Sequence, residues 1–359
     1  MAVTGLGVTS RVAYTDKQGY YEDLLQQAKE DNGNDGFYRV EDSGRKTKND
    51  DSLYGYRSAT IFSSLMNLDV SHLFQSLYME GGKNFYCYNG ASPLPSAMFS
   101  VKYMLSSNPV DESPLRTLLG SSNGNYLYRN NYCLPLGYMM SEKAIKGWES
   151  SMLDRIGSLN SLAQQLGAKG DMLYPAACTQ SQAAGDTTID ISEDGYYYAD
   201  YVTCNADSLT VSRDDGWTQQ YGKTTHRYLL DLGECKAGTK VHITNLNAET
   251  IEYHVYRLNF KAMCTAYETL SEQTMSLEKM TDRRIVGSID VRQAGRLILS
   301  VPADEGWTLY VDGKKTKIKP FADALIGVHL KEGTHKIELR YTTPGVQITV
   351  PGVVHTDLL

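Results

Sequence analysis

Histidine and cysteine are the residue types that most often bind metals or carry out nucleophilic chemistry, and here they are scattered along the chain. The seven histidines form no H-E-x-x-H motif, and the six cysteines form no C-x-x-C pair. Cys87 and Cys133 lie among aromatic and apolar residues, so we expect buried thiols. Nucleophilic catalysis has no clear site, and we predict no metal and no catalytic residue in this chain.

The best calcium candidate is the loop that begins at Asp31, and it does not fit an EF-hand. Position three of that loop is Gly33, which has no side-chain oxygen, and position twelve is Asp42 instead of glutamate. The sequence also contains no P-loop and no G-x-G-x-x-G phosphate cradle. We therefore expect no cofactor. A pair of catalytic carboxylates need not be close in sequence, so a soluble glycan-active enzyme remains an alternative.

Aromatic side chains are the other candidates for chemistry, because flat rings can stack on sugars. The chain has 26 tyrosines against 7 phenylalanines, which favours half-buried strands and polar ligand surfaces. Trp217 follows a turn, and we select it as a candidate sugar-binding residue. The run Tyr196, Tyr197 and Tyr198 must alternate between the two faces of a strand, so we expect some of these rings to point outward. The alternative is that they cover a domain interface.

Composition restricts the classes of partner. The chain has 35 basic and 42 acidic residues, a net charge of -7, so it lacks the basic surplus that nucleic acids require. No apolar run approaches the roughly 20 residues of a membrane helix. The first residues lack the basic start and apolar core of a signal peptide. We expect no nucleic-acid partner and no membrane span within this sequence.

The periodicity of apolar residues predicts an α+β, multidomain protein. Residues 10–168 form a mixed α/β domain, with a strand at 37–42 and a helical segment over 141–168 that is interrupted, if anywhere, near Gly157. Short strands separated by Asp-Gly turns predict a jelly-roll-like β-sandwich over 186–260. A helical linker over 261–283 then leads to a second β-sandwich over 284–350, with a hairpin at Asp312-Gly313. The last residues either add a strand or form a tail.

Two groups of motifs resemble the YfhO family of bacterial membrane proteins. The first group is FYRVED, YGYRSATIFSS, FSVKYMLS and YLYRNNYCLPLGYMM, in that order between residues 37 and 140. The second is Gly-Trp at 306–307, Val-Asp-Gly-Lys at 311–314, Gly-Thr-His at 333–335, and Tyr341 with Pro-Gly at 344–345. The threonine inserted at position 334 is a small departure from the family pattern.

This resemblance implies that the chain is the extracytoplasmic C-terminal region of a multi-pass, GT-C-like glycosyltransferase. Such proteins use polyprenyl-phosphate sugars and are associated with glycosylation of cell-envelope polymers such as lipoteichoic acid. The catalytic acid is expected in the membrane portion, so the fragment itself would be a non-catalytic acceptor-binding or structural module. Its expected location is the extracellular face of the bacterial membrane. Its expected partners are the membrane portion of the same polypeptide and a cell-envelope glycopolymer.

The first domain is the expected contact surface for that polymer. The loop with Tyr56, Arg57, Ser63 and Ser64 carries hydrogen-bond donors suited to a sugar or a phosphodiester. With Trp217, these are the candidate binding residues, unless they pack or cap within the domain. A free-standing cell-surface carbohydrate-binding or adhesion protein is the second alternative function.

Overall fold

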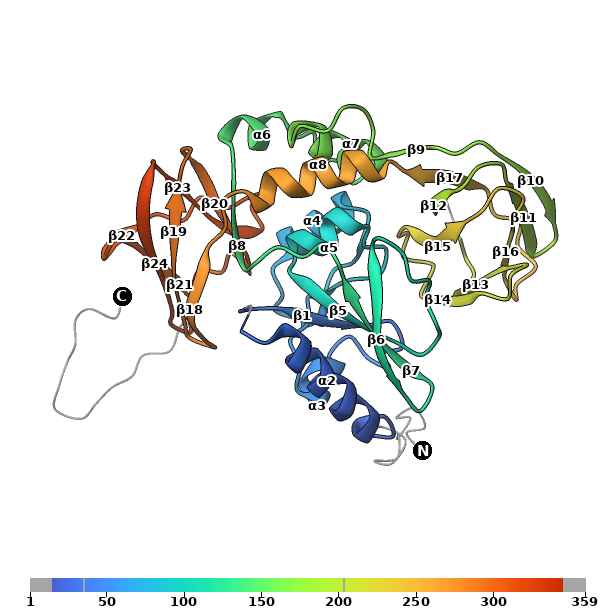
Figure 1. The fold of residues 1–359 in the computed structure, drawn as a ribbon, viewed down its shortest axis with the longest axis horizontal. Coiled ribbons are helices and arrows are strands. Elements are labelled where there is room, and N and C mark those ends of the chain that lie inside the picture. Colours follow the sequence, from blue (N-terminus) through green and yellow to red (C-terminus); the bar gives the residue numbers. More distant parts are fainter. Residues whose placement is uncertain (1–14, 35, 203, 345–359) are drawn as a thin grey trace, which may run out of the picture.

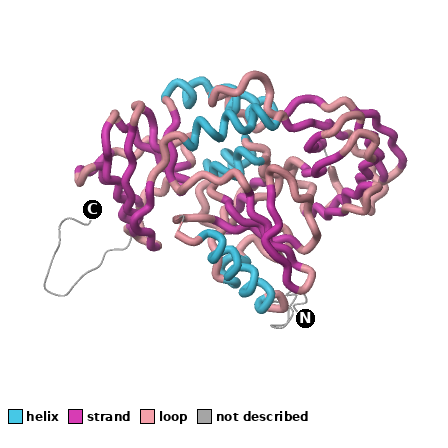
Figure 2. Tube along the Cα trace, in the orientation of Figure 1, coloured by secondary structure: helices cyan, strands magenta, loops and turns pink. Residues whose placement is uncertain are grey.

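The computed structural model describes residues 15–34, 36–202 and 204–344, so the predicted C-terminal strand or tail beyond residue 344 lies outside the described residues. Helices occupy the centre of the molecule, and a β-sandwich lies at each end of its long axis (Figures 1 and 2). The protein has the predicted α+β, multidomain fold, which confirms the fold class. We call the three parts the N-terminal module, the middle sandwich and the C-terminal sandwich.

The N-terminal module is built around a four-stranded sheet. Its spatial order is β1 (Arg39–Asp42), β5 (Val101–Ser106), β7 (Asn125–Asn130) and β6 (Arg116–Ser122). Helix α2 (Gln18–Asn32) packs on β6 and β7 through Tyr21, Leu24 and Ala28, which form its apolar face. A smaller sheet contains β2 (Ile61–Phe62), β4 (Phe85–Cys87) and β3 (Glu80–Gly81). The remaining helices are α3 (Asp50–Tyr54), α4 (Leu68–Ser76) and α5 (Pro93–Met98).

Two antiparallel sheets form the middle sandwich. One has the order β10 (Cys178–Ala183), β11 (Asp186–Ile191), β16 (Lys240–Thr244), β13 (Ser208–Arg213), β14 (Thr218–Gly222). The other has the order β15 (Leu230–Cys235), β12 (Gly195–Tyr201), β17 (Tyr253–Leu258), β9 (Leu173–Pro175). Their inward-facing side chains share one apolar core.

The predicted helical segment over 141–168 is interrupted earlier than expected, so the expected break near Gly157 was wrong. Helix α6 (Glu142–Gly147) ends before Trp148, and α7 (Arg155–Gln165) begins after it. Trp148 stacks on Phe321 with ring centroids 5.2 Å apart and donates its indole N–H to the carbonyl of Ser158. Asp154 accepts from the backbone N–H of Gly157 and caps α7. Tertiary packing of Trp148 thus outweighs helix continuity.

Helix α8 (Phe260–Ser271) connects the two sandwiches and crosses above α4 and α5 of the N-terminal module (Figure 1). It ends at Ser271, and the second half of the predicted helical linker instead forms strand β18 (Ser276–Thr281). Strand β18 pairs with β19 at the edge of the sheet, and this pairing satisfies the backbone groups of β18 that face β19.

The C-terminal sandwich contains strands from its predicted range and two strands from outside that range, β18 and β8 (Gly137–Met140). One sheet has the order β18, β19 (Arg284–Val291), β24 (Gly333–Tyr341), β21 (Trp307–Val311), β22 (Lys314–Thr316). The other has the order β23 (Leu325–Leu330), β20 (Gly295–Pro302), β8. Strand β8 comes from the N-terminal part of the sequence, so the C-terminal sandwich is closed by a distant segment.

The C-terminal motif residues support one another. The Asp312-Gly313 turn joins β21 and β22 with φ of 52° and 77°, as a type I′ hairpin requires, which confirms the predicted hairpin. A Cβ at Gly306 would lie 2.5 Å from the Tyr341 ring, so glycine is needed there. Trp307 packs edge-on against the same ring at 5.0 Å. This motif is structural.

His335 completes the hairpin, because its Nδ1 lies 2.8 Å from Asp312 Oδ2 and its Nε2 lies 3.0 Å from the Lys331 carbonyl. Both ring nitrogens face acceptors, so both donate and the ring is an imidazolium. The hydrogen bond to Asp312 raises the pKa of His335, and the same bond lowers the pKa of Asp312.

The pair therefore predicts a pH-dependent stability. The contribution of His335 is complete below its ordinary pKa and is lost as pH rises through its raised pKa. The contribution of Asp312 is lost as pH falls through its lowered pKa. Because both groups are near the surface, His335→Gln should lower the unfolding free energy by at most about 1 kcal/mol. Urea unfolding at about pH 5.5 should show this difference, and at about pH 9 it should largely vanish. A difference that grows with pH would contradict the assignment.

Candidate functional site

A cavity of about 960 Å³ lies between the N-terminal module and the middle sandwich. We call it the junction cleft. One wall is made by the segment 43–48 and by 84–91, and the other by β14 and the segment that follows it to Asp231. Segments far apart in the sequence therefore build one site, which is a common position for ligand binding.

Basic residues outnumber acidic ones in this cleft. Its lining includes the five cations Arg45, Lys46, Lys48, Arg116 and Lys223, and the two carboxylates Asp207 and Asp231. His226 also lines it. The whole chain carries a net charge of -7, so the cleft concentrates positive charge in an acidic protein. Low-dielectric walls strengthen such a local field and favour an anionic ligand.

Glu80 organises the wall on the N-terminal side. It is fully buried on β3 and accepts hydrogen bonds from Lys48 Nζ at 3.0 Å and Asn89 Nδ2 at 2.8 Å. Its Oε1 also lies 3.0 Å from Nδ1 of His226 in the middle sandwich. Burial acts to raise the pKa of Glu80, but the charge and hydrogen bond of Lys48 and the bond from His226 together lower it. The carboxylate is therefore ionised and fixes Lys48 and His226 in the cleft.

Arg45 lies on the same wall as Lys48 and is held by three hydrogen-bond acceptors. Its guanidinium donates to the Asp42 carbonyl at 2.6 Å, to Cys87 Sγ at 2.7 Å and to Asn89 Oδ1. Burial raises the pKa of the Cys87 thiol to about 11, so this cysteine is an inert packing group. The thiols of Cys87, Cys204 and Cys235 are buried, whereas those of Cys133, Cys178 and Cys264 are partly exposed. The prediction of buried thiols is therefore confirmed for Cys87 and only in part for Cys133.

The floor of the cleft is a charge pair between the two parts. Arg116 on β6 donates to the Tyr196 hydroxyl at 2.9 Å and to Asp231 Oδ2 at 3.0 Å. The Tyr196 hydroxyl donates to the same carboxylate oxygen at 2.8 Å. Tyr198 lies beside Tyr196, whereas Tyr197 points into the core of the middle sandwich. All three rings are buried, so the expectation that some point outward was wrong, and Tyr196 and Tyr198 cover the domain interface instead.

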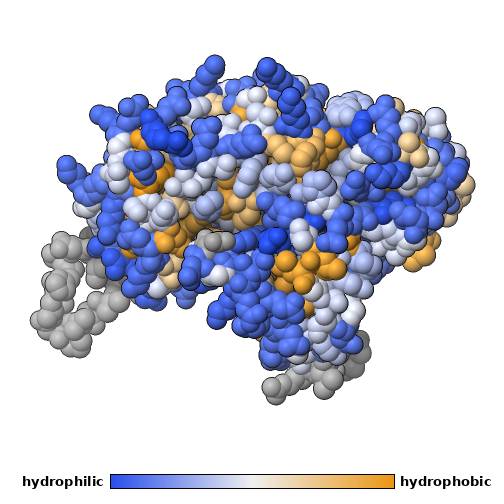
Figure 3. Space-filling model, viewed as in Figure 1, coloured by the Kyte–Doolittle hydropathy of each residue, from blue (hydrophilic) through white to orange (hydrophobic). Residues whose placement is uncertain are grey.

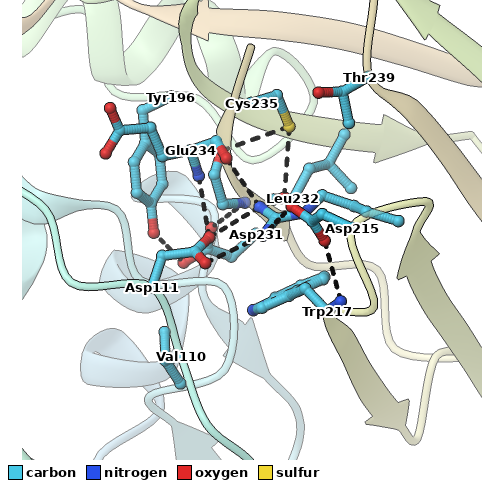
Figure 4. Close-up of polar contacts among 12 residues, drawn as sticks. Val110, Asp111, Tyr196, Asp215, Trp217, Asp231, Leu232, Glu234, Cys235 and Thr239 are labelled. Atoms are coloured by element: carbon cyan, nitrogen blue, oxygen red, sulfur yellow. Dashed lines mark hydrogen bonds and ion pairs between the residues drawn. The ribbon is translucent and has the colours of Figure 1, made fainter.

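A second ion pair holds the sandwich wall in place (Figure 4). Arg213 on β13 is buried and donates to both oxygens of Asp111, at 2.7 and 2.9 Å. Its guanidinium also lies 4.7 Å from the centre of the Trp217 ring. Trp217 directly precedes β14, Gln219 and Tyr221 lie on one face of that strand, and all three line the cleft. The pair thus positions an aromatic wall opposite the lysines.

The predicted binding residues are not brought together. Trp217 lines the junction cleft, and Ser63 lines a smaller cavity of about 400 Å³ between the N-terminal module and the C-terminal sandwich. Arg57 and Ser64 are exposed and line neither cavity. Tyr56 packs against the core under α2, and burial raises its pKa. The role of these five residues in binding stays a prediction.

The cleft cations were missed because no short motif marks them. Lys46 and Lys48 stand in an ordinary polar loop, and Lys223 and His226 follow β14. The only sequence signal is the pair of closely spaced lysines in KTK. The cations of the two walls lie in one cleft only because the N-terminal module packs against the middle sandwich.

Ser122 has the G-x-S-x-G spacing of a nucleophile elbow, but its local structure differs from that of an elbow. Residues 120–124, G-S-S-N-G, cover the end of β6 and the turn to β7, where Asn123 and Gly124 have φ of 46° and 73°. A nucleophile elbow instead joins a strand to a helix. Within the described residues, no group of three histidine, cysteine, aspartate or glutamate side chains is placed to hold a metal ion.

Comparison with known proteins identifies relatives by sequence. The model of the family described as bacterial membrane protein YfhO matches residues 1–350. An uncharacterized protein YfhO from Bacillus subtilis (strain 168) is 21% identical over 345 residues. That match covers 83% of this chain and 39% of the relative, so the chain spans about two fifths of the relative's length. Among the helices of the described residues, none is long and apolar enough to cross a membrane.

Solved structures add no information about the fold. A conserved protein of unknown function from Pseudomonas aeruginosa PAO1 is 10% identical, with coverage of 46% of this chain and 84% of that chain and a TM-score of 0.17. A cupin 2 conserved barrel domain protein from Leptotrichia buccalis is 11% identical, with coverage of 47% and 89% and a TM-score of 0.12. Scores this low carry no argument.

The Asp111–Arg213 pair yields a stability prediction. Asp111→Asn keeps the shape of the side chain but leaves the buried guanidinium without its main counter-charge, and breaking such a pair costs a few kcal/mol. Because Asp111 is partly exposed, we expect a loss of about 2–3 kcal/mol in the unfolding free energy, measured by urea unfolding.

The matched control is Asp207→Asn. Asp207 pairs with Lys223, and both side chains are largely exposed, so this variant should lose less than about 1 kcal/mol. Equal losses in the two variants would contradict a structural role for the buried pair.

Proposed function

This chain belongs to the YfhO family of bacterial membrane proteins, and from that premise we propose that it is the extracytoplasmic region of an envelope glycosyltransferase that holds the acceptor polymer. The proposed acceptor is an anionic glycopolymer such as lipoteichoic acid, bound in the junction cleft at the outer face of the membrane. The transfer chemistry is assigned to the membrane portion of the same polypeptide.

One observation carries this proposal: the junction cleft concentrates cations in an acidic protein. Lys46 on one wall and Lys223 on the other are 30% and 63% exposed at their side chains, so both can reach a ligand in the cleft. Each is paired with an exposed aspartate, Asp16 or Asp207, and such surface pairs are weak enough for a phosphodiester to replace. Ammonium groups bind phosphate oxygens through charge-assisted hydrogen bonds.

The aromatic wall supports a glycopolymer over a simple anion. Trp217 and Tyr221 line the cleft next to Gln219, and aromatic rings beside polar groups suit the mixed apolar and hydroxylated surface of a sugar. The cleft volume of about 960 Å³ is sufficient for several polymer units, since pockets for small ligands typically start at about 300 Å³.

Holding the acceptor explains why a non-catalytic region would matter. A lipid-linked sugar reacts where its phosphate leaves the membrane, and a polymer bound nearby is present at high effective concentration. The chain's own carboxylates do not suggest a second reaction at this site. Asp231 is occupied by Arg116, Tyr196 and the backbone N–H of Gly233, so it is a structural acceptor and not an available base.

The proposal predicts that polymer binding depends on the two wall lysines. Lys46→Gln combined with Lys223→Gln should weaken binding of a purified polyglycerol-phosphate polymer by at least about tenfold, because hydrogen bonds to charged groups contribute about 1.5 kcal/mol or more each. Binding of the unmodified chain should also weaken with salt, and less steeply in the double variant. Isothermal titration calorimetry measures both.

A matched control replaces two lysines outside the cleft. Lys240 pairs with Asp190 on the middle sandwich, and Lys336 pairs with Glu278 on the C-terminal sandwich. Lys240→Gln combined with Lys336→Gln removes the same charge and should leave the affinity within about twofold, since distant exposed charges are screened. An equal loss in both double variants would show that only net charge matters and would refute a specific cleft.

A further inference from the structure

A short segment of the N-terminal module exposes three large apolar side chains. Phe62, Leu65 and Leu68 are 47%, 95% and 47% exposed, all within seven residues. We call residues 62–68 the apolar loop. On the face shown in Figure 3, hydrophilic residues cover most of the surface and apolar areas are separate. Exposed apolar side chains that gather in one segment mark candidate interaction sites.

Hydrogen bonds at both ends of the apolar loop hold its side chains in exposed positions. The backbone N–H of Ser63 donates to the Asn84 carbonyl at 2.9 Å, and Ser63 Oγ accepts from the N–H of Leu65 at 3.2 Å. At the other end Asn67 caps α4 by accepting from the N–H of Asp69 at 2.8 Å. Its amide donates to the Ala303 carbonyl of the C-terminal sandwich at 3.0 Å. The loop is held at both ends with Leu65 outward.

Lysines flank the loop. Asn49 makes two hydrogen bonds to the backbone of Phe62, at 3.0 and 2.9 Å, and so joins the loop to the segment that carries Lys46 and Lys48. Lys83 is exposed in the turn next to Asn84, which contacts Ser63. Acidic residues also lie near the loop: Asp69 is at the start of α4, and Asp51 lines the smaller cavity together with Phe62 and Ser63. Apolar side chains bordered by lysines and hydroxyls match the polarity gradient at the surface of a bilayer.

Leu246 shows that a single exposed leucine does not by itself mark an interaction site. It is 97% exposed at the far side of the middle sandwich. The segment 244–252, T-N-L-N-A-E-T-I-E, contains no lysine or arginine and offers one large apolar side chain near that tip. The apolar loop differs in having three such side chains and a basic border.

We propose that the apolar loop inserts into the interfacial layer of a phospholipid bilayer. A stable protein interface buries about 800 Å² on each partner, which three side chains do not supply, whereas shallow insertion into lipid needs only a few. Phe62 belongs to the apolar loop and also lines the junction cleft. Insertion of the loop therefore places the mouth of the cleft at the level of the lipid headgroups. Insertion of the apolar loop is independent of polymer binding in the cleft.

The test uses the 359-residue chain with vesicles that contain phosphatidylglycerol and phosphatidylcholine. Leu65→Glu should lower the vesicle partition coefficient by about tenfold or more, because burial of one leucine is worth at least that factor. Leu246→Glu introduces the same charge at an equally exposed leucine and should leave partition unchanged. Both side chains are solvent-exposed, so both variants should keep the unfolding midpoint of the unmodified chain. Vesicle flotation gives the bound fractions.

Three outcomes would overturn the proposal. The first is that the unmodified chain does not float with the vesicles, and the second is that the two variants lose binding equally. The third is that sedimentation shows a dimer without lipid that Leu65→Glu converts to a monomer, which would make the loop a contact between copies. Retained binding of the Leu246→Glu variant together with lost binding of the Leu65→Glu variant supports insertion.

Discussion

Ion pairs across one domain junction determine the shape of the candidate site. Arg116 pairs with Asp231 and Asp111 pairs with Arg213, each across the junction between the N-terminal module and the middle sandwich. A hydrogen bond between Glu80 and His226 crosses the same junction. Charges removed from water are costly unless they are paired, so the two parts can close only where these partners meet. The cleft between them is therefore fixed by electrostatics, while its walls carry the groups that could contact a ligand. The same contacts explain how a chain without a short functional motif at this site forms a defined cavity.

A shared apolar core extends this constraint to the whole chain. Leu73 of α4 and Met263 of α8 belong to one cluster with Leu229 of the middle sandwich and Phe321 of the C-terminal sandwich. Strand β8 leaves the N-terminal part of the sequence to complete the sheet that contains β20. Such exchange of elements makes relative movement of the parts costly. A ligand in the junction cleft would thus contact a preformed site.

The sequence was informative about local structure and about motif residues, and much less so about the cleft. Asp312-Gly313 specifies a hairpin through its own backbone preferences, and Glu41 of the FYRVED motif fixes the YRSAT segment by accepting from Ser58, Ala59 and Thr60. These motifs maintain the scaffold. Lys46 and Lys223 are 177 residues apart, and their approach depends on tertiary packing that no short pattern encodes. The misplaced helix break at Trp148 has the same cause, because a stacking partner 173 residues away decides it.

Hydrogen–deuterium exchange with and without a polyglycerol-phosphate polymer tests the central claim most directly, because it reports where the ligand binds. Binding in the junction cleft should add protection in 43–48, 84–91 and 217–231, the segments that line the cleft, and leave exchange unchanged in the C-terminal hairpin at 307–316. Protection confined to other surfaces, or no change at saturating polymer, would contradict the assignment of the cleft as the acceptor site.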